Sequence, residues 1–156
     1  MYQGKGSVII ILATVGIAMN LGILISILFK FPLSKHIIVP YIGIFLIVAG
    51  MIIRFIAVRS LGRFFTIYVT IQENHKIIKD GLYKIIRHPS YLGSLISFFG
   101  FGISINNWIS LIIITIPIVI AFLYRIKDEE NILLKQFGLD YSEYMENTYR
   151  LIPFNY

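Results

Sequence analysis

Long runs of apolar residues, separated by short polar stretches, are the feature of this sequence that most limits its possible folds. Two runs occupy residues 7–29 and 37–58, and two more occupy residues 89–105 and 108–124. A helix needs roughly 20 predominantly apolar residues to cross a hydrocarbon core about 30 Å thick. Because a backbone crossing lipid must satisfy its own hydrogen bonds, such runs predict helices. The sequence therefore predicts an all-α integral membrane protein of about four transmembrane helices, forming a single domain over residues 1–156.

The composition favours a membrane protein and excludes several kinds of site. Apolar residues make up 57% of the chain and charged residues 14%, whereas soluble domains average about 25% charged residues. The absence of cysteine excludes disulfides, thiolate catalysis and cysteine-based metal sites. The three histidines show no paired helical spacing, so no metal site is predicted. The net charge of +6 is spread over loops, and nucleic-acid binding is not predicted.

The distribution of Lys and Arg predicts the orientation in the membrane. Cytoplasmic loops carry an excess of basic residues, and the stretches that follow the second and fourth apolar runs lie on the same side of an alternating topology. We therefore expect a multi-pass protein of the cell membrane with both termini, and any site near these stretches, on the cytoplasmic side. The basic residues of the two stretches are Arg59, Arg63, Lys76, Lys79, Lys84 and Arg87, and then Arg125, Lys127, Lys135 and Arg150.

Small residues recur at helical spacing along the third run, which is short for a span. Gly93, Ser97, Gly100 and Ser104 form a stripe that favours close contact with another helix. Asn106 and Asn107 leave room only for a tight turn before the fourth run begins. The third and fourth runs are therefore predicted to form a helical hairpin.

The tail after residue 124 alternates charged residues with apolar ones and is too polar for a fifth span. An amphipathic helix that lies along the cytoplasmic face fits this pattern better. The apolar residues that can share one face of it are Ile126, Leu133, Leu134, Phe137, Tyr141 and Tyr144.

Two polar segments, residues 72–91 and 125–130, should meet where the predicted hairpin leaves the membrane. Arg, Glu, His and Tyr side chains gathered beside lipid suggest a functional site. Each residue also has a simpler interpretation. Arg125 and Glu129, four residues apart, could form a surface ion pair worth tenths of a kcal/mol. His88 could satisfy backbone groups at a helix start, and Glu130 could be a solvated neighbour of Glu129. The combination favours the functional interpretation.

Two linked motifs resemble a known family. Gly81-Leu-Tyr-Lys-Ile-Ile-Arg-His-Pro-Ser-Tyr-Leu-Gly resembles the Arg-His-Pro-x-Tyr-x-Gly signature of the isoprenylcysteine carboxyl methyltransferases. Asp128-Glu-Glu-Asn-Ile-Leu-Leu-Lys-Gln-Phe-Gly, followed by Tyr141 and Tyr144, is similar to that family's acidic pair and Phe-Gly-x-x-Tyr-x-x-Tyr tail, and Arg150-Leu-Ile-Pro matches its usual ending. The likeness covers about residues 61–153, and two motifs at the right separation are a strong signal.

The resemblance implies that S-adenosylmethionine binds in a cytoplasm-facing pocket and leaves as S-adenosylhomocysteine. It places the cofactor-binding elements, a polar loop and the last helices, at about residues 61–93 and 125–153. Arg125 and Glu129 would be the catalytic residues, Arg125 facing the acceptor's carboxylate and Glu129 binding the cofactor or ordering the pocket. The cofactor would be lined by Gln72, His75, Lys76, Ile77, Ile78, Tyr83, His88, Pro89, Ser90, Tyr91 and Glu129.

The reaction that the resemblance implies is carboxyl O-methylation of an isoprenylcysteine-like substrate. A carboxylate is ionised near neutral pH and needs no general base. A phospholipid amine, a lipophilic phenol or pyrone hydroxyl, or a small thiol is an alternative acceptor, for which His75, His88 or Tyr91 could be the base. A non-enzymatic small membrane protein is the second alternative. The expected partners are a lipophilic small-molecule or lipid-like substrate and membrane lipids, without nucleic acid; the sequence indicates no oligomeric state.

Overall fold

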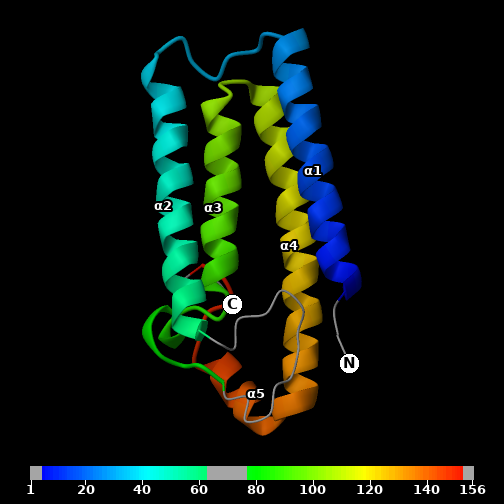
Figure 1. The fold of residues 1–156 in the computed structure, drawn as a ribbon, viewed down its shortest axis with the longest axis vertical. Helices are drawn as coiled ribbons and strands as arrows, with labels where there is room; N and C mark the ends of the chain where they lie inside the picture. Colours follow the sequence, from blue (N-terminus) through cyan, green and yellow to red (C-terminus); the bar gives the residue numbers. More distant parts are fainter. Residues whose placement is uncertain (1–4, 63–76, 153–156) are drawn as a thin grey trace.

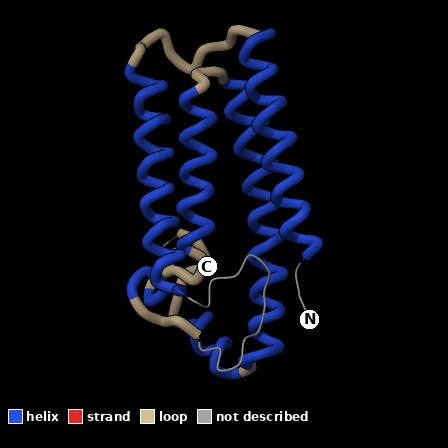
Figure 2. Tube along the Cα trace, in the orientation of Figure 1, coloured by secondary structure: helices blue, strands red, loops and turns tan. Residues whose placement is uncertain are grey.

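The computed structural model describes residues 5–62 and 77–152, and most of these residues are helical (Figures 1 and 2). Within this part of the chain the only β-type pairing is one isolated bridge. The predicted all-α class is confirmed. The helices are α1 (Lys5–Leu28), α2 (Ile38–Leu61), the short 3-10 helix η2 (Gly81–Lys84), α3 (Pro89–Ser104), α4 (Trp108–Phe137) and α5 (Leu139–Glu146).

The four long helices run side by side and alternate in direction (Figure 1). They form two antiparallel pairs, since α2 packs mainly on α3 and α1 packs mainly on α4, while α3 and α4 join the pairs. One end of the bundle carries the α1–α2 connection and the α3–α4 turn. The other end carries the first residues of α1, the start of α3, the last turns of α4 and the whole of α5 (Figure 1). The described parts of the predicted polar segments, residues 77–91 and 125–130, share this second end.

The outer surface of the bundle is apolar, as expected for helices in lipid. Large hydrophobic side chains such as Ile9, Phe45 and Ile120 are exposed along the helices. Among the described residues, α1, α2 and α4 are long and apolar enough to cross a membrane. The 16 residues of α3 are fewer than a span ordinarily needs, as its short apolar run indicated. It lies alongside the longer helices α2 and α4.

Helix α4 does not end near Tyr124, where the fourth apolar run stops. It continues to Phe137 without a break, because charged residues such as Lys and Glu are good helix formers and neither Gly nor Pro interrupts them. Gly138, with φ of +55°, ends the helix in a conformation that favours glycine. The predicted amphipathic C-terminal helix is therefore the extension of α4 followed by the short α5, rather than a separate helix.

Glycines bring α2 and α3 into close contact. A Cβ atom placed on Gly43 would lie 2.6 Å from the carbonyl oxygen of Gly100, and one placed on Gly93 would lie 2.6 Å from that of Gly50. Ser97 donates its hydroxyl to the carbonyl of Ile47 across the same interface at 3.1 Å. The predicted role of the small-residue stripe in close helix contact is confirmed.

The turn between α3 and α4 sets their antiparallel arrangement. Asn106 adopts φ of +55°, and the Asn107 side chain caps α4 by accepting a hydrogen bond from the Ser110 amide at 3.1 Å. Asn107 also donates to the carbonyl of Phe29 at the end of α1. The predicted hairpin is confirmed, and it places the first turn of α3 beside the last turns of α4.

Candidate functional site

The two predicted polar segments meet at the start of α3. The Tyr91 hydroxyl donates to Glu129 Oε2 at 2.5 Å, and His88 Nε2 lies 3.3 Å from Glu130 Oε1. These contacts join residues about 40 positions apart in the chain. The expectation that the Arg-His-Pro-Ser-Tyr and Asp-Glu-Glu stretches come together at one end of the bundle is confirmed.

The local backbone explains why His88 can reach α4. His88 is the N-cap of α3, and Pro89 follows it at the first helical position, where no amide donor is needed. The His88 side chain makes no capping hydrogen bond, so the simpler interpretation, in which this side chain satisfies backbone groups at the helix start, is wrong. Its ring stacks on Tyr91, with centroids 5.6 Å apart and an interplanar angle of 10°, and both rings face α4.

Glu130 is the buried centre of a charge cluster, which we call the Glu130 cluster: Arg87, His88, Glu130 and Arg150. Arg87 and His88 are buried as well, whereas Arg150 is exposed. Arg87 Nε lies 3.1 Å from Glu130 Oε1, and Arg150 Nη2 lies 2.8 Å from Glu130 Oε2. Glu130 is only 3% exposed, so its interpretation as a solvated neighbour of Glu129 is wrong. A signal was present in the sequence, because Glu130 follows the apolar Ile126 at i+4, on the same face of α4.

The charges around Glu130 keep it ionised. Burial would raise the pKa of its carboxyl group, but hydrogen bonds and positive charge from His88 and Arg150 outweigh burial and lower the pKa to about 2. Burial raises the pKa of the Tyr144 phenol to about 12 and that of the Tyr83 phenol above its ordinary range. Both phenols are therefore neutral hydrogen-bond donors near pH 7.

The segment after α5 packs back onto the loop before α3. Ile86 and Tyr149 form a parallel bridge, in which the Arg87 amide donates to the Tyr149 carbonyl at 2.8 Å and the Tyr149 amide donates to the Ile85 carbonyl at 2.9 Å. The Tyr144 hydroxyl adds a 2.6 Å hydrogen bond to the Tyr83 carbonyl, and Arg87 also donates to the Thr148 carbonyl. The tail thus fixes the loop that carries His88.

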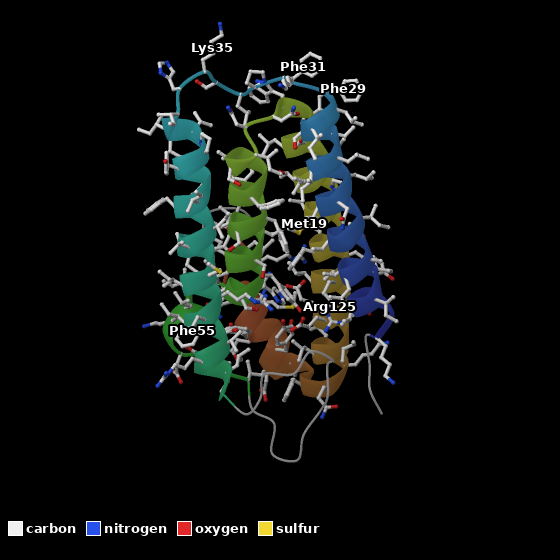
Figure 3. The ribbon with its side chains drawn as sticks, turned by 45° about the horizontal axis from the view of Figure 1, so that its top comes forward. Met19, Phe29, Phe31, Lys35, Phe55 and Arg125 are labelled. Atoms are coloured by element: carbon white, nitrogen blue, oxygen red, sulfur yellow. The ribbon has the colours of Figure 1, made fainter. Side chains whose placement is uncertain are left out.

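Arg125 is the centre of a second group, the Arg125 cluster: Ser7, Tyr91, Arg125, Asp128 and Glu129. Arg125 is 2% exposed and points into the bundle (Figure 3). It donates from Nη1 to Ser7 Oγ at 2.8 Å and from Nε to the Tyr91 hydroxyl at 3.3 Å. Glu129 and Asp128 approach it at 3.9 and 3.8 Å. The expected ion pair between Arg125 and Glu129 is therefore present, but it is not a surface pair, because Arg125 is buried.

Most of the other predicted site residues lie close to these clusters. Ile77 and Ile78 are half-buried just before η2, and Tyr83 is buried within η2. Pro89 and Ser90 are buried in the first turn of α3. Gln72, His75 and Lys76 lie outside the described residues. Arg87, Arg150 and Ser7 are not among the predicted site residues, although the first two belong to the recognised motifs.

The chemistry of the donor set suits a polar organic cation. The side chains of Asp128 and Glu129 are 36% and 24% exposed, so their carboxylates remain open to a ligand, whereas the buried carboxylate of Glu130 is already bonded to Arg87, His88 and Arg150. The stacked rings of His88 and Tyr91 add an aromatic surface next to these acids. Within residues 5–62 and 77–152, no group of three His, Asp or Glu side chains is arranged to hold a metal ion.

Comparison with known proteins extends these observations. The sequence model of the isoprenylcysteine carboxyl methyltransferase (ICMT) family matches residues 42–135. That range includes most of α2, the whole of α3 and most of α4, and with them His88, Tyr91, Arg125 and Glu129. It includes neither α1 nor the tail that bridges to Ile86.

Individual relatives carry the corresponding name. A probable protein-S-isoprenylcysteine O-methyltransferase of rice (Oryza sativa subsp. indica) is 35% identical over 127 residues, covering 80% of this chain and 66% of the relative. Protein-S-isoprenylcysteine O-methyltransferase A of Arabidopsis thaliana is 36% identical over 80% of this chain and 64% of its own length. The chain thus spans slightly less than two thirds of these curated relatives.

One solved structure is also similar. A eukaryotic intramembrane Ras methyltransferase, also an isoprenylcysteine carboxyl methyltransferase, superposes with a TM-score of 0.69 at 30% sequence identity. The superposition covers 74% of this chain and 42% of that protein. The helical arrangement is therefore shared with an intramembrane enzyme that is considerably longer.

Proposed function

Because the chain belongs to the isoprenylcysteine carboxyl methyltransferase family, we propose that it methylates the carboxylate of a lipophilic, isoprenylcysteine-like acceptor, using S-adenosylmethionine. The observation that carries this proposal is the pair of contacts from Tyr91 to Glu129 and from His88 to Glu130. They bring the two family motifs together into one polar site at the end of an apolar bundle. The product of the cofactor would be S-adenosylhomocysteine.

The residues at this site fit a cofactor that carries a positive charge and several polar groups. S-adenosylmethionine supplies a methyl group that its sulfonium activates for transfer. The partly open carboxylate of Glu129 would accept hydrogen bonds from the cofactor, and the His88 and Tyr91 rings would lie against its charged part. We further propose that Ile77, Ile78, Tyr83, Pro89 and Ser90 contribute to the binding surface. Gln72, His75 and Lys76 complete the proposed set.

Arg125 is proposed to hold the acceptor's carboxylate. A guanidinium can donate two parallel hydrogen bonds to a carboxylate, and this fixes the acceptor's direction as well as its distance. Alignment of two reactants can supply about 7–11 kcal/mol of rate acceleration, and an ionised carboxylate needs no base to remove a proton. Asp128 and Glu129, at 3.8 and 3.9 Å, lie beyond ordinary hydrogen-bond length. Their hold on Arg125 is therefore looser than that of a hydrogen-bonded ion pair.

The bundle supports a reaction at the membrane surface. Exposed apolar side chains on α1, α2 and α4 would keep the site next to lipid, where a prenyl-type tail dissolves. Burial of Arg125 and partial burial of Tyr91 would limit water around the reacting groups. We propose that the chain forms a single domain that lies in the cell membrane. We also propose that the site and both termini face the cytoplasm, since the basic segments border the end of the bundle that carries the site.

Calorimetric titration of the detergent-purified protein with S-adenosylhomocysteine tests the cofactor assignment. We expect one site per chain, and folded protein that shows no binding would remove the methyltransferase proposal. Transfer of a labelled methyl group to a prenylated cysteine, to phosphatidylethanolamine and to a long-chain phenol then tests the acceptor. We expect the prenylated cysteine to be the preferred acceptor. Preference for either of the other two acceptors would redirect the proposal to that acceptor class.

A further inference from the structure

We propose that Ser7 is a positioning residue for Arg125, so that the first helix completes a site otherwise built from α3 and α4. Ser7 is 3% exposed and lies in α1, 118 residues before Arg125. Its hydroxyl accepts a hydrogen bond from Arg125 Nη1 at 2.8 Å and donates one to Asp128 Oδ2 at 2.5 Å. This inference rests on the proposed function, in which Arg125 holds the acceptor.

The distances show that Ser7 bridges two charges that do not bond directly. Arg125 Nη1 and Asp128 Oδ2 are 3.8 Å apart, too far for an ordinary hydrogen bond. A hydroxyl can accept from the cation and donate to the anion at the same time. Ser7 therefore satisfies both groups and keeps the guanidinium from closing onto the carboxylate. A directly paired guanidinium would have less freedom to bind another carboxylate.

Arg125 is oriented by neutral oxygen atoms from two helices. Its Nε faces the Tyr91 hydroxyl of α3 at 3.3 Å, while its Nη1 faces Ser7 of α1. Two such contacts at different nitrogens fix the plane of the guanidinium. Because a two-pronged contact with a carboxylate requires coplanar groups, the direction of this plane decides whether the acceptor is aligned.

Helix α1 is docked firmly enough to place Ser7 accurately. Ala18 of α1 belongs to a buried core with Ile114, Ile118 and Phe122 of α4. A Cβ atom on Gly22 would lie 2.6 Å from Ile114 Cγ1, so the two helices touch at this point. Rigid support of this kind is what a positioning contact needs. Helix α1 lies outside the residues matched by the family model.

Substitution at Ser7 separates positioning from folding. We expect Ser7→Ala to raise the KM for the prenylated-cysteine acceptor about tenfold while the affinity for S-adenosylhomocysteine stays within about twofold. Ser7→Thr keeps the hydroxyl and should restore the acceptor KM to within about threefold. Ser26→Ala is the matched control, because Ser26 of the same helix bonds only locally among its described contacts, to the Ile23 carbonyl. An unchanged acceptor KM in Ser7→Ala, failure of Thr to rescue, or a parallel loss of cofactor affinity would each overturn the proposal.

A melting experiment tests the contact without any activity. If Ser7 and Arg125 act as a pair, the double variant Ser7→Ala, Arg125→Gln should melt at a temperature close to that of the Arg125→Gln variant alone. Additive losses in melting temperature would contradict the pairing. If the wild-type protein binds no S-adenosylhomocysteine, the proposed function fails. The melting temperatures of the single and double variants would still decide whether Ser7 holds Arg125.

Discussion

The central residues of the two charge clusters, Arg125 and Glu130, lie within two turns of each other on α4. The two clusters are nevertheless built in opposite ways. In the Glu130 cluster one buried carboxylate is surrounded by Arg87, His88 and Arg150. In the Arg125 cluster one buried guanidinium is flanked by two carboxylates that remain partly exposed. The first cluster is enclosed and holds the tail against the start of α3. The second keeps open acceptors and longer ion-pair distances, which is the arrangement that a ligand-binding group needs.

We therefore expect substitutions that remove a charge to have different effects in the two clusters. Loss of charge in the Glu130 cluster should reduce stability, because Arg87 and His88 are buried and cannot turn to water. Loss of charge in the open cluster should reduce binding or turnover while the fold persists.

The largest expected effect is that of Glu130→Gln on stability. Breaking a buried ion pair by neutralising one partner typically costs about 3–5 kcal/mol, since the remaining charges stay buried without compensation. We expect the melting temperature in detergent to fall by about 10 °C. Glu143→Gln, at an exposed position of α5, is the control and should change the free energy of unfolding by less than about 0.5 kcal/mol. Equal melting temperatures for the two variants would show that the Glu130 cluster does not stabilise the fold.

The second effect concerns Arg125→Lys. Lysine keeps the charge but cannot donate two parallel hydrogen bonds, so kcat/KM for a carboxylate acceptor should fall about 100-fold, equivalent to about 2.7 kcal/mol. Methyl transfer to a neutral phenol should change by less than about threefold. An equal loss for charged and neutral acceptors, measured in the same membranes, would contradict a role for Arg125 in holding the acceptor.

The third effect concerns Glu129→Gln, which keeps the shape of the side chain but removes its charge. Hydrogen bonds to charged groups contribute about 1.5–3 kcal/mol, so the affinity for S-adenosylhomocysteine should fall at least about tenfold. The melting temperature should stay within about 2 °C, because the Glu129 side chain is partly exposed. Asp140→Asn, on the exposed face of α5, serves as the control. A stability loss as large as that of Glu130→Gln would erase the distinction between the two clusters.

The parts of this fold that sequence reasoning could predict are those set by continuous or local patterns. The helical bundle follows from uninterrupted apolar runs. The meeting of His88 with Glu130 and of Tyr91 with Glu129 follows from the tight Asn106–Asn107 turn, which fixes the hairpin. The length of α4 could not be read in the same way, because the change to charged residues after Tyr124 marks the end of the apolar surface and not the end of the helix.

Contacts between distant, isolated residues left no pattern to read. Ser7 is a single polar residue at the start of an apolar helix, and nothing in its surroundings indicates a partner 118 positions away. The bridge between Ile86 and Tyr149 involves too few residues to show the alternation of a strand. For Glu130 the sequence does carry a local pattern, since its i+4 relation to Ile126 places it on the buried face of the helix. Its place in an acidic run, however, favours a solvated position.

The smallest expected effect concerns the hydrogen bond between α5 and η2. Tyr144→Phe removes the 2.6 Å hydrogen bond to the Tyr83 carbonyl, which is worth about 0.5–1.5 kcal/mol for a neutral pair. The melting temperature should therefore fall by about 2–4 °C, while Tyr124→Phe, at an exposed position of α4, should have no effect. Because Tyr144 touches the backbone of η2 and none of the residues of the Arg125 cluster in the described contacts, methyl transfer at a temperature where both variants are folded should stay within about twofold of wild type. A tenfold loss of turnover without a loss of stability would mean that the tail takes part in ligand binding, and the division between an enclosed anchor and an open site would then be wrong.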